Sequence, residues 1–127
     1  KEMLPIIDKP VVQFVVEEAV EAGIGDVLII TGRGKRAIEN HFDYAPGLET
    51  FLQEAGKPDL ARLVREIGDH CDIFFIRQKE QMGLGDAIRL ARRYTGGEPF
   101  SVLLGDSIID SPPDGPTGLR QIIDASA

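Results

Sequence analysis

Residues 77–88, RQKEQMGLGDAI, are a candidate ligand-binding turn. They contain a glutamine and two glycines, and a helical pattern follows them. The apolar run DIFFI precedes the turn and the amphipathic run AIRLARRY follows it, so a strand should end and a helix begin here. Gly83 and Gly85 lack a Cβ and would let a flat ligand approach the backbone, and the helix N-terminus would direct N–H groups toward it. The Gln78 amide can match a carbonyl and N–H edge such as that of uracil. A purely structural turn is the alternative, since glycine is also the usual solution to a tight connection.

Asp106 ends the aliphatic run SVLLGD and is a second candidate for chemistry. A carboxylate at the C-terminal tip of a buried strand can hold Mg²⁺ against a polyphosphate. The alternative is an aspartate that caps the next turn, and both interpretations stay open at this point. For nearby Asp110 we expect no role in the site. The basic segment TGRGKR, residues 31–36, lacks the spacing of a P-loop, and we expect its charges to face solvent.

Covalent catalysis has no candidate in this sequence, because no Ser, Thr or Cys has the surroundings of an activated nucleophile. His41 and His70 are far apart and fit neither a metal-ligand nor a triad spacing, so we expect both to be structural. Cys71 is the single cysteine, which excludes an intrachain disulfide and a multi-cysteine zinc site. It borders an apolar run, and we expect a buried, reduced thiol.

The chain must position these residues with alternating strands and helices. Continuous aliphatic runs predict strands that are buried on both faces, as in a parallel sheet, and they lie at 26–31, 72–78 and 99–106. Helical patterns cover residues 10–23, 35–42, 48–55, 58–68, 86–94 and 117–125, and residues 1–10 read as a loop punctuated by prolines. This order predicts an α/β fold with a doubly wound, mostly parallel, Rossmann-like sheet. Ligands bind such sheets at the carboxyl ends of the strands, which here lead into residues 32–35, 78–85 and 105–110.

Length and charge narrow the function further. The chain has 127 residues, which suits one domain, and 21 acidic against 14 basic residues give a net charge of −7. No basic stripe is available to neutralise the phosphates of duplex nucleic acid, so we expect no nucleic-acid partner. A small anionic ligand remains compatible, because Mg²⁺ and backbone N–H groups can receive phosphates. No apolar stretch approaches the ~20 residues that span a membrane, so we expect a cytoplasmic protein without a membrane partner.

The first segment, KEMLPIIDKPVVQFVVEEAVEAGI, resembles the part of sugar-phosphate nucleotidylyltransferases that follows their glycine-rich loop and contains the signature lysine. The resemblance continues through LIITGRGKRAIENHFD, IRQKEQMGLGDAI and GGEPFSVLLGD, and so covers nearly the whole chain. It is greatest with the members that use UTP and glucose 1-phosphate. These motifs in this order imply transfer of a uridylyl group to glucose 1-phosphate, with release of pyrophosphate and with Mg²⁺ as cofactor.

The resemblance also implies roles for individual positions. Lys1 matches the signature lysine, which neutralises charge on the reacting phosphates, and Glu2 matches a residue that contacts the nucleoside. Gln78 matches the glutamine that reads the uracil edge. Gly83 matches the glycine whose backbone meets the base, and Gly85 belongs to the same nucleotide-binding turn. The metal ligand of the family, an aspartate, corresponds to Asp106.

Two positions depart from the family pattern. The family usually has GLGHA where this chain has GLGDA with Asp86, an acid that would oppose an anionic substrate unless it faces away or shares the metal. Gly105 stands where many uridylyltransferases have proline. A thymidylyltransferase for glucose 1-phosphate is therefore one alternative, although Glu2 stands where such an enzyme would have Gln. A non-catalytic regulatory paralogue is another, and Asp86 is the feature that supports it.

In the family, a first strand with its glycine-rich loop precedes the position of Lys1, and the sugar-phosphate-binding half follows residue 127. The resemblance thus implies that residues 1–127 are a partial nucleotide-binding domain, incomplete at both ends, of an enzyme that is a homo-oligomer at full length. The first strand would lie between the strands at 26–31 and 100–104. Without it the inner edges lack hydrogen-bond partners, so we expect the piece alone to be inactive and poorly stable.

Overall fold

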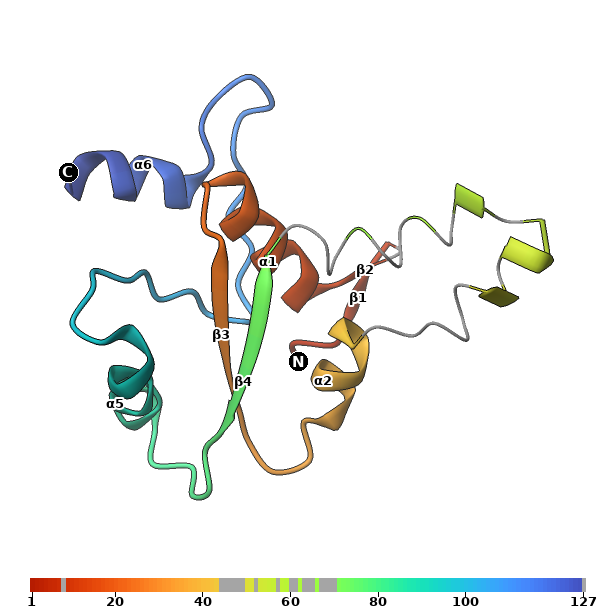
Figure 1. Cartoon of the computed structure of the whole chain (residues 1–127). Helices are drawn as coiled ribbons and strands as arrows, with labels where there is room; N and C mark the ends of the chain where they lie inside the picture. The colour runs from red at the N-terminus through yellow and green to blue at the C-terminus, as the bar shows by residue number, and fades with distance from the viewer. Residues whose placement is uncertain are drawn as a thin grey trace.

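Figure 1 shows the computed structural model, which describes residues 1–7, 9–43, 50–51, 53–56, 58–59, 62, 66 and 71–126. Its elements in chain order are β1 (Pro5–Ile6), β2 (Lys9–Pro10), α1 (Val11–Glu21), β3 (Asp26–Thr31), α2 (Arg36–Phe42), β4 (Asp72–Arg77), α5 (Leu84–Thr95) and α6 (Gly118–Ser126). Four expected helices and two expected strands are confirmed to within about two residues at each end. The helices expected at 48–55 and 58–68 fall largely outside the described residues.

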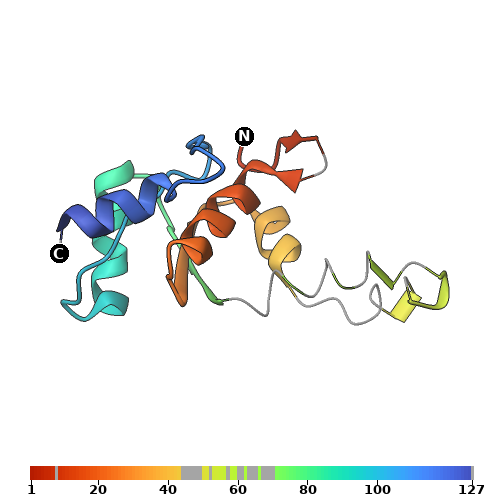
Figure 2. The same cartoon turned by 90° about the horizontal axis from the view of Figure 1, so that it is seen from above.

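Strands β3 and β4 form a parallel pair in register from Asp26 opposite Asp72 to Thr31 opposite Arg77. Helices lie on both faces of the pair, but the expected burial of both strands is wrong, because Thr31 is the one buried residue within β3 and β4 and Phe74 is 43% exposed. Val27 packs against the core cluster of Ala19, Ala22 and Leu119, whereas Phe74, on the other face, meets the Tyr94 ring of α5 at a centroid distance of 5.2 Å. Figure 2 shows α1 and α5 on opposite sides of the two strands. The expected doubly wound arrangement is thus confirmed for this part of the sheet.

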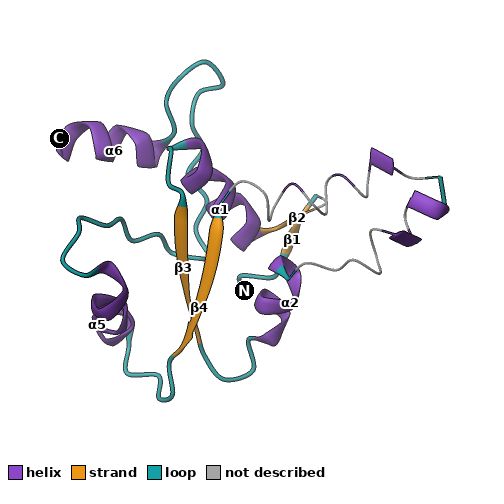
Figure 3. Cartoon of the chain, in the orientation of Figure 1, coloured by secondary structure: helices purple, strands orange, loops and turns teal. Residues whose placement is uncertain are grey.

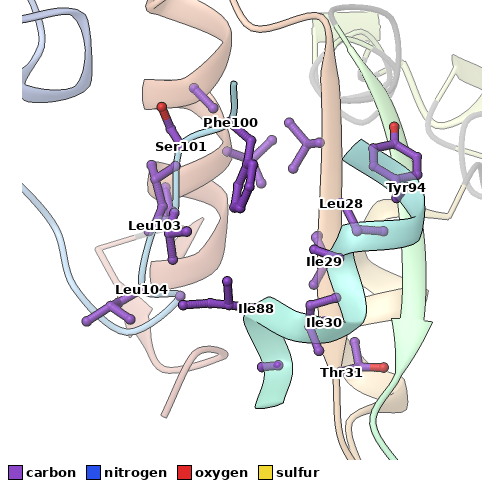
Figure 4. A pocket seen from close by; sticks show the side chains of 18 of the residues that line it. Leu28, Ile29, Ile30, Thr31, Ile88, Tyr94, Phe100, Ser101, Leu103 and Leu104 are labelled. Carbon is purple, nitrogen blue, oxygen red and sulfur yellow. The ribbon is translucent and has the colours of Figure 1, made fainter. Parts of the chain in front are cut away.

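The strand expected at 99–106 is wrong, because this segment carries no backbone ladder and Figure 3 draws it as a loop. It runs beside β3 at a distance that leaves a slot of about 740 Å³ between them. Aliphatic and aromatic side chains line the slot, with Leu28, Ile29 and Ile30 on one side and Phe100, Leu103 and Leu104 on the other (Figure 4). A strand requires a hydrogen-bonded neighbour, and among the described residues nothing fills this position.

The loop expected at residues 1–10 instead contains a short antiparallel pairing of β1 with β2. The same segment caps α1, because the Val12 N–H donates to the Glu2 carbonyl at 2.9 Å and the Val11 N–H donates to the Leu4 carbonyl at 3.1 Å. These bonds satisfy main-chain donors that a helix N-terminus otherwise leaves free. Glu2 is therefore held at a fixed place relative to α1.

Helix α1 supplies most of the core. Its apolar residues recur on one face, as expected for a helix that packs on a sheet, and the buried ones are Val11, Val12, Val15, Val16 and Ala19. Helix α6 attaches to α1 through Leu119, whose side chain is buried against Ala19 and Ala22 and whose N–H donates to the Glu18 carboxylate at 3.0 Å. In the described part of the chain, no helix is long and apolar enough to cross a membrane.

Candidate functional site

The candidate site lies at the carboxyl ends of β3 and β4, where the two following loops are in contact. The Gln78 N–H donates to the Thr31 carbonyl at 2.7 Å, which extends the pairing of the strands by one more bond. Beyond it, the Gln81 side chain lies over Gly32. A Cβ added to Gly32 would be 2.9 Å from the Gln81 amide nitrogen, so a larger residue here would displace the end of this flexible side chain. The expectation that the strand ends gather these loops is confirmed for β3 and β4.

Glu2 forms the first side-chain group of the site, together with Lys35 from the loop after β3. The Lys35 ammonium donates to Glu2 Oε2 at 2.6 Å. This bond, helped by a main-chain hydrogen bond, lowers the pKa of Glu2 to about 2, so the carboxylate is ionised at neutral pH. The Glu2 stem also lies beside Gly105, because a Cβ added there would be 3.5 Å from Glu2 Cγ. Glu2 therefore joins the first segment, the β3 loop and the segment before Asp106.

Lys35 is a site residue that sequence reasoning missed. We expected the charges of residues 31–36 to face solvent, and Arg33 and Arg36 are indeed exposed. The Lys35 side chain is only 35% exposed and is bonded to Glu2. A pair separated by 33 positions has no local sequence signal, so only the fold could reveal it.

The glycine turn begins α5 as expected. Gly83 is the N-cap residue with φ +86° and ψ 179°, a conformation that side-chain-bearing residues rarely adopt. Its carbonyl accepts the Ala87 N–H at 3.3 Å. Backbone geometry therefore explains Gly83 without a ligand.

Gly85 has no such internal explanation. Its φ is not positive, and a Cβ placed on it would meet no atom within 4 Å. Glycine in a helix is less favourable than alanine by about 1 kcal/mol. The residue thus costs stability and leaves open space beside the first turn of α5, which suits the close approach of a ligand.

Gln78 and Asp86 form the second side-chain group of the site. Gln78 is buried, with 9% of its surface exposed, and its amide nitrogen donates to Asp86 Oδ2 at 2.8 Å. Arg89 donates to Asp86 Oδ1 through Nε at 3.1 Å and through Nη2 at 2.7 Å. The Gln78 amide and then Arg89 lower the pKa of Asp86. The contacts of Asp86 with Gln78 and Arg89, like the Glu2–Lys35 bond, were not predicted from the sequence.

Asp106 and Lys1 are both exposed. Asp106 lies in the turn that the Ser107 N–H closes on the Leu104 carbonyl at 3.1 Å. Among the described residues no hydrogen bond or ion pair reaches the Asp106 carboxylate, and no three acidic, histidine or cysteine side chains form a metal-binding cluster. Glu2 is already bonded to Lys35, so Asp106 is the carboxylate that remains available to a cation beside Gly105.

The remaining candidates behave as structural residues where the structure describes them. His41 Nε2 lies 2.9 Å from Gln13 Oε1, and burial lowers the pKa of the imidazole. Cys71 is a buried free thiol whose pKa is raised by burial. The expected buried thiol is confirmed, the structural role of His41 stays a prediction, and His70 lies outside the described residues.

Comparison with known proteins identifies this arrangement. The model of the nucleotidyl transferase family matches residues 1–127. The chain belongs to the nucleotidyl transferase family. The resemblance that the sequence motifs indicated is therefore confirmed, and the turn at the start of α5 lies in a nucleotidyl transferase fold.

The relatives of this nucleotidyl transferase chain share a narrower name. It is 55% identical over 124 residues to a UTP–glucose-1-phosphate uridylyltransferase of Bacillus subtilis, covering 98% of this chain and 41% of the relative. A UTP-bound UDP-glucose pyrophosphorylase (UGPase) of Acinetobacter baumannii superposes with a TM-score of 0.91 at 36% identity, covering 98% of this chain and 44% of that one. A UDP-glucose pyrophosphorylase complexed with UDP-glucose gives a TM-score of 0.79 at 40% identity, again over 98% of this chain and 44% of that one. The chain thus spans less than half the length of these proteins.

Proposed function

We propose that this chain is the nucleotide-binding part of an enzyme that transfers a uridylyl group from UTP to glucose 1-phosphate, giving UDP-glucose and pyrophosphate. The observation that carries the proposal is the 55% identity, over 98% of the chain, to a protein named for this reaction. The open glycine turn beside a buried glutamine supports it independently, because a Cβ on Gly85 would meet no atom of the described residues within 4 Å.

In this reaction an oxygen of the sugar phosphate attacks the α-phosphorus of UTP. The bond from that phosphorus to the bridging oxygen breaks, and pyrophosphate leaves with the bonding electrons. The protein need not form a covalent bond, so catalysis depends on positioning and on neutralising charge. This agrees with a site built from amides, glycines and paired charges rather than an activated nucleophile.

Each candidate residue has a place in this scheme. Gln78 reads the uracil edge, and Gly83 and Gly85 admit the ring to the first turn of α5. Glu2 contacts the nucleoside, and the bond from Lys35 holds its carboxylate in one position. For the exposed Lys1 we propose the neutralisation of charge on the reacting phosphates.

Mg²⁺ fits this arrangement at Asp106. The ion prefers oxygen ligands and is commonly held by one or two carboxylates, with water and substrate phosphates completing its shell. An exposed carboxylate without a protein partner in the described residues has that chemistry. The bound ion would supply charge neutralisation on the phosphates.

We also propose that residues 1–127 are part of one nucleotide-binding domain, and that a strand of the same polypeptide occupies the slot beside β3. The slot has an apolar lining along β3, and Glu2, Lys35 and Gly105 lie among its lining residues. A parallel strand there would pair with β3 and would end near the candidate site. A cytoplasmic location and a homo-oligomeric enzyme stay predictions.

The test uses the full-length protein with glucose 1-phosphate, Mg²⁺ and either UTP or dTTP, and measures pyrophosphate release. We expect preference for UTP and a loss of turnover of about a hundredfold or more in Asp106→Ala. Asp110→Ala, an exposed acid four residues further on, is the matched control and should keep the activity.

Other outcomes would contradict the proposal in distinct ways. Preference for dTTP would indicate a thymidylyltransferase. Binding of UTP without pyrophosphate release would indicate a regulatory paralogue. Unchanged turnover in Asp106→Ala would contradict the role of Asp106 as metal ligand but not the proposed reaction.

A further inference from the structure

The bonds among Gln78, Asp86 and Arg89 fix the orientation of a buried amide. An ionised carboxylate can only accept hydrogen bonds, so Gln78 must turn its NH₂ group, not its carbonyl, toward Asp86. The 2.8 Å contact joins Gln78 Nε2 to Asp86 Oδ2, and the same nitrogen lies 3.5 Å from the Gly83 carbonyl. Both hydrogens of the amide thus have acceptors within the protein.

Arg89 supports this orientation from the solvent side. It holds the other carboxylate oxygen with two bonds, so Asp86 cannot rotate away without losing both. The Gln78 Oε1 atom is left as the one hydrogen-bonding atom of the side chain with no partner among the described residues. A ligand that meets Gln78 therefore meets an acceptor.

We propose that Asp86 is a specificity-determining residue, which fixes Gln78 as an acceptor and so selects a pyrimidine that carries an N–H at N3. The inference rests on the proposed function, in which Gln78 faces the base. Uracil and thymine carry that N–H, whereas cytosine presents a lone pair at N3. Two facing acceptors leave a buried group unsatisfied, so a cytidine nucleotide is rejected.

The presence of an acid near a polyphosphate is then explained without a metal. The Asp86 carboxylate accepts hydrogen bonds from both Gln78 and Arg89. Its effect on the site is to orient the Gln78 side-chain amide.

The test compares UTP with CTP in the full-length protein, with kcat/KM for pyrophosphate release and with equilibrium binding as readouts. Asp86→Asn can present either an NH₂ or a carbonyl to Gln78, so the glutamine becomes free to turn over. We expect the UTP-to-CTP ratio to fall about tenfold or more, chiefly through better use of CTP. Glu80→Gln removes one exposed acid from the same turn and should leave the ratio unchanged.

A second variant guards against misfolding of the first. Arg89→Gln alters an exposed side chain and removes the bonds that hold Asp86. It should therefore also lower the ratio of kcat/KM for UTP to kcat/KM for CTP, but by less than Asp86→Asn. An Asp86→Asn enzyme that loses UTP and CTP activity equally, or keeps its ratio, would overturn the inference while the function stands. A wild-type protein that neither binds nor uses UTP would overturn the proposed function and this inference together.

Discussion

Three acidic residues of the candidate site differ in what they contact, and this decides what each can do. The Glu2 carboxylate accepts a hydrogen bond from Lys35, and the Asp86 carboxylate accepts hydrogen bonds from Gln78 and Arg89. The Asp106 carboxylate has no partner in the described part of the chain. Of these three carboxylates, the pairing leaves that of Asp106 open to a cation. The sequence could rank these acids by motif, but it could not show their partners.

The Glu2–Lys35 bond gives stability a defined dependence on pH. Its folded pKa of about 2 lies below the ordinary 4.5, so the stabilisation is complete above about pH 4.5 and is lost as the pH falls toward 2. We expect the difference in unfolding free energy between wild type and Glu2→Gln to be constant at neutral pH and to shrink across that window. Urea unfolding at several pH values measures it. Lys35→Met should reproduce the effect, and a difference that grows on acidification would contradict the assignment.

Gly85 should show opposite effects on stability and on binding. Gly85→Ala places a methyl group in open space on a helix, so we expect a gain of about 0.5–1 kcal/mol in unfolding free energy. The same methyl group should obstruct the base and weaken UTP binding at least several-fold, as measured by calorimetry. Gly25→Ala is the control, because its Cβ also meets nothing and it lies at the opposite end of β3. Unchanged UTP affinity in Gly85→Ala would mean that no ligand approaches there.

Among the secondary-structure elements, the local sequence was sufficient to predict those whose conformation depends mainly on their own residues. The face of α1 and the aliphatic runs of β3 and β4 could be predicted in this way. It failed for residues 99–106, whose apolar sequence resembles that of β3, because a strand also needs a neighbour with which to pair. Pairing is a property of two segments, and one segment cannot specify it.

Helix α6 depends on an acceptor supplied by another helix. The Glu18 carboxylate accepts the Leu119 N–H at 3.0 Å, across 101 positions. Glu18→Ala should cost about 1 kcal/mol, the usual effect of losing an N-terminal cap, and should speed hydrogen exchange of the α6 amides first. Glu21→Ala, an exposed acid on the same helix, should leave both unchanged. Equal exchange in the two variants would show that α6 does not rely on Glu18.

For the whole molecule, the slot beside β3 dominates the behaviour of the isolated chain. Phe100, Val102 and Leu104 line it and remain 52%, 51% and 49% exposed. An open strand edge next to apolar surface promotes association between chains. The site residues are therefore assembled at the end of a two-stranded sheet in which the other edge of β3 is unpaired among the described residues.

The isolated chain of residues 1–127 should bind the dye ANS and form species that grow with rising concentration, whereas the full-length protein should bind no dye and keep one defined oligomeric size. Val102→Lys, a charge placed in the slot, should reduce association of the isolated chain. Dye fluorescence and size-exclusion chromatography give the two readouts. A monomeric chain without dye binding would mean that the slot closes on its own.

The buried Cys71 can report on the opening of the β3–β4 pair, through the rate at which its thiol reacts. It is the one thiol of the chain, and it stands immediately before β4, where the Asp72 N–H is bonded to the Gly25 carbonyl at 2.9 Å. Because the residue is 8% exposed, a thiol reagent reaches it only through a local opening, and we expect separation of this end of the β3–β4 pair to provide that opening. The alkylation rate of Cys71 therefore measures how often the two strands part, and a nucleotide that bridges their far ends should slow it.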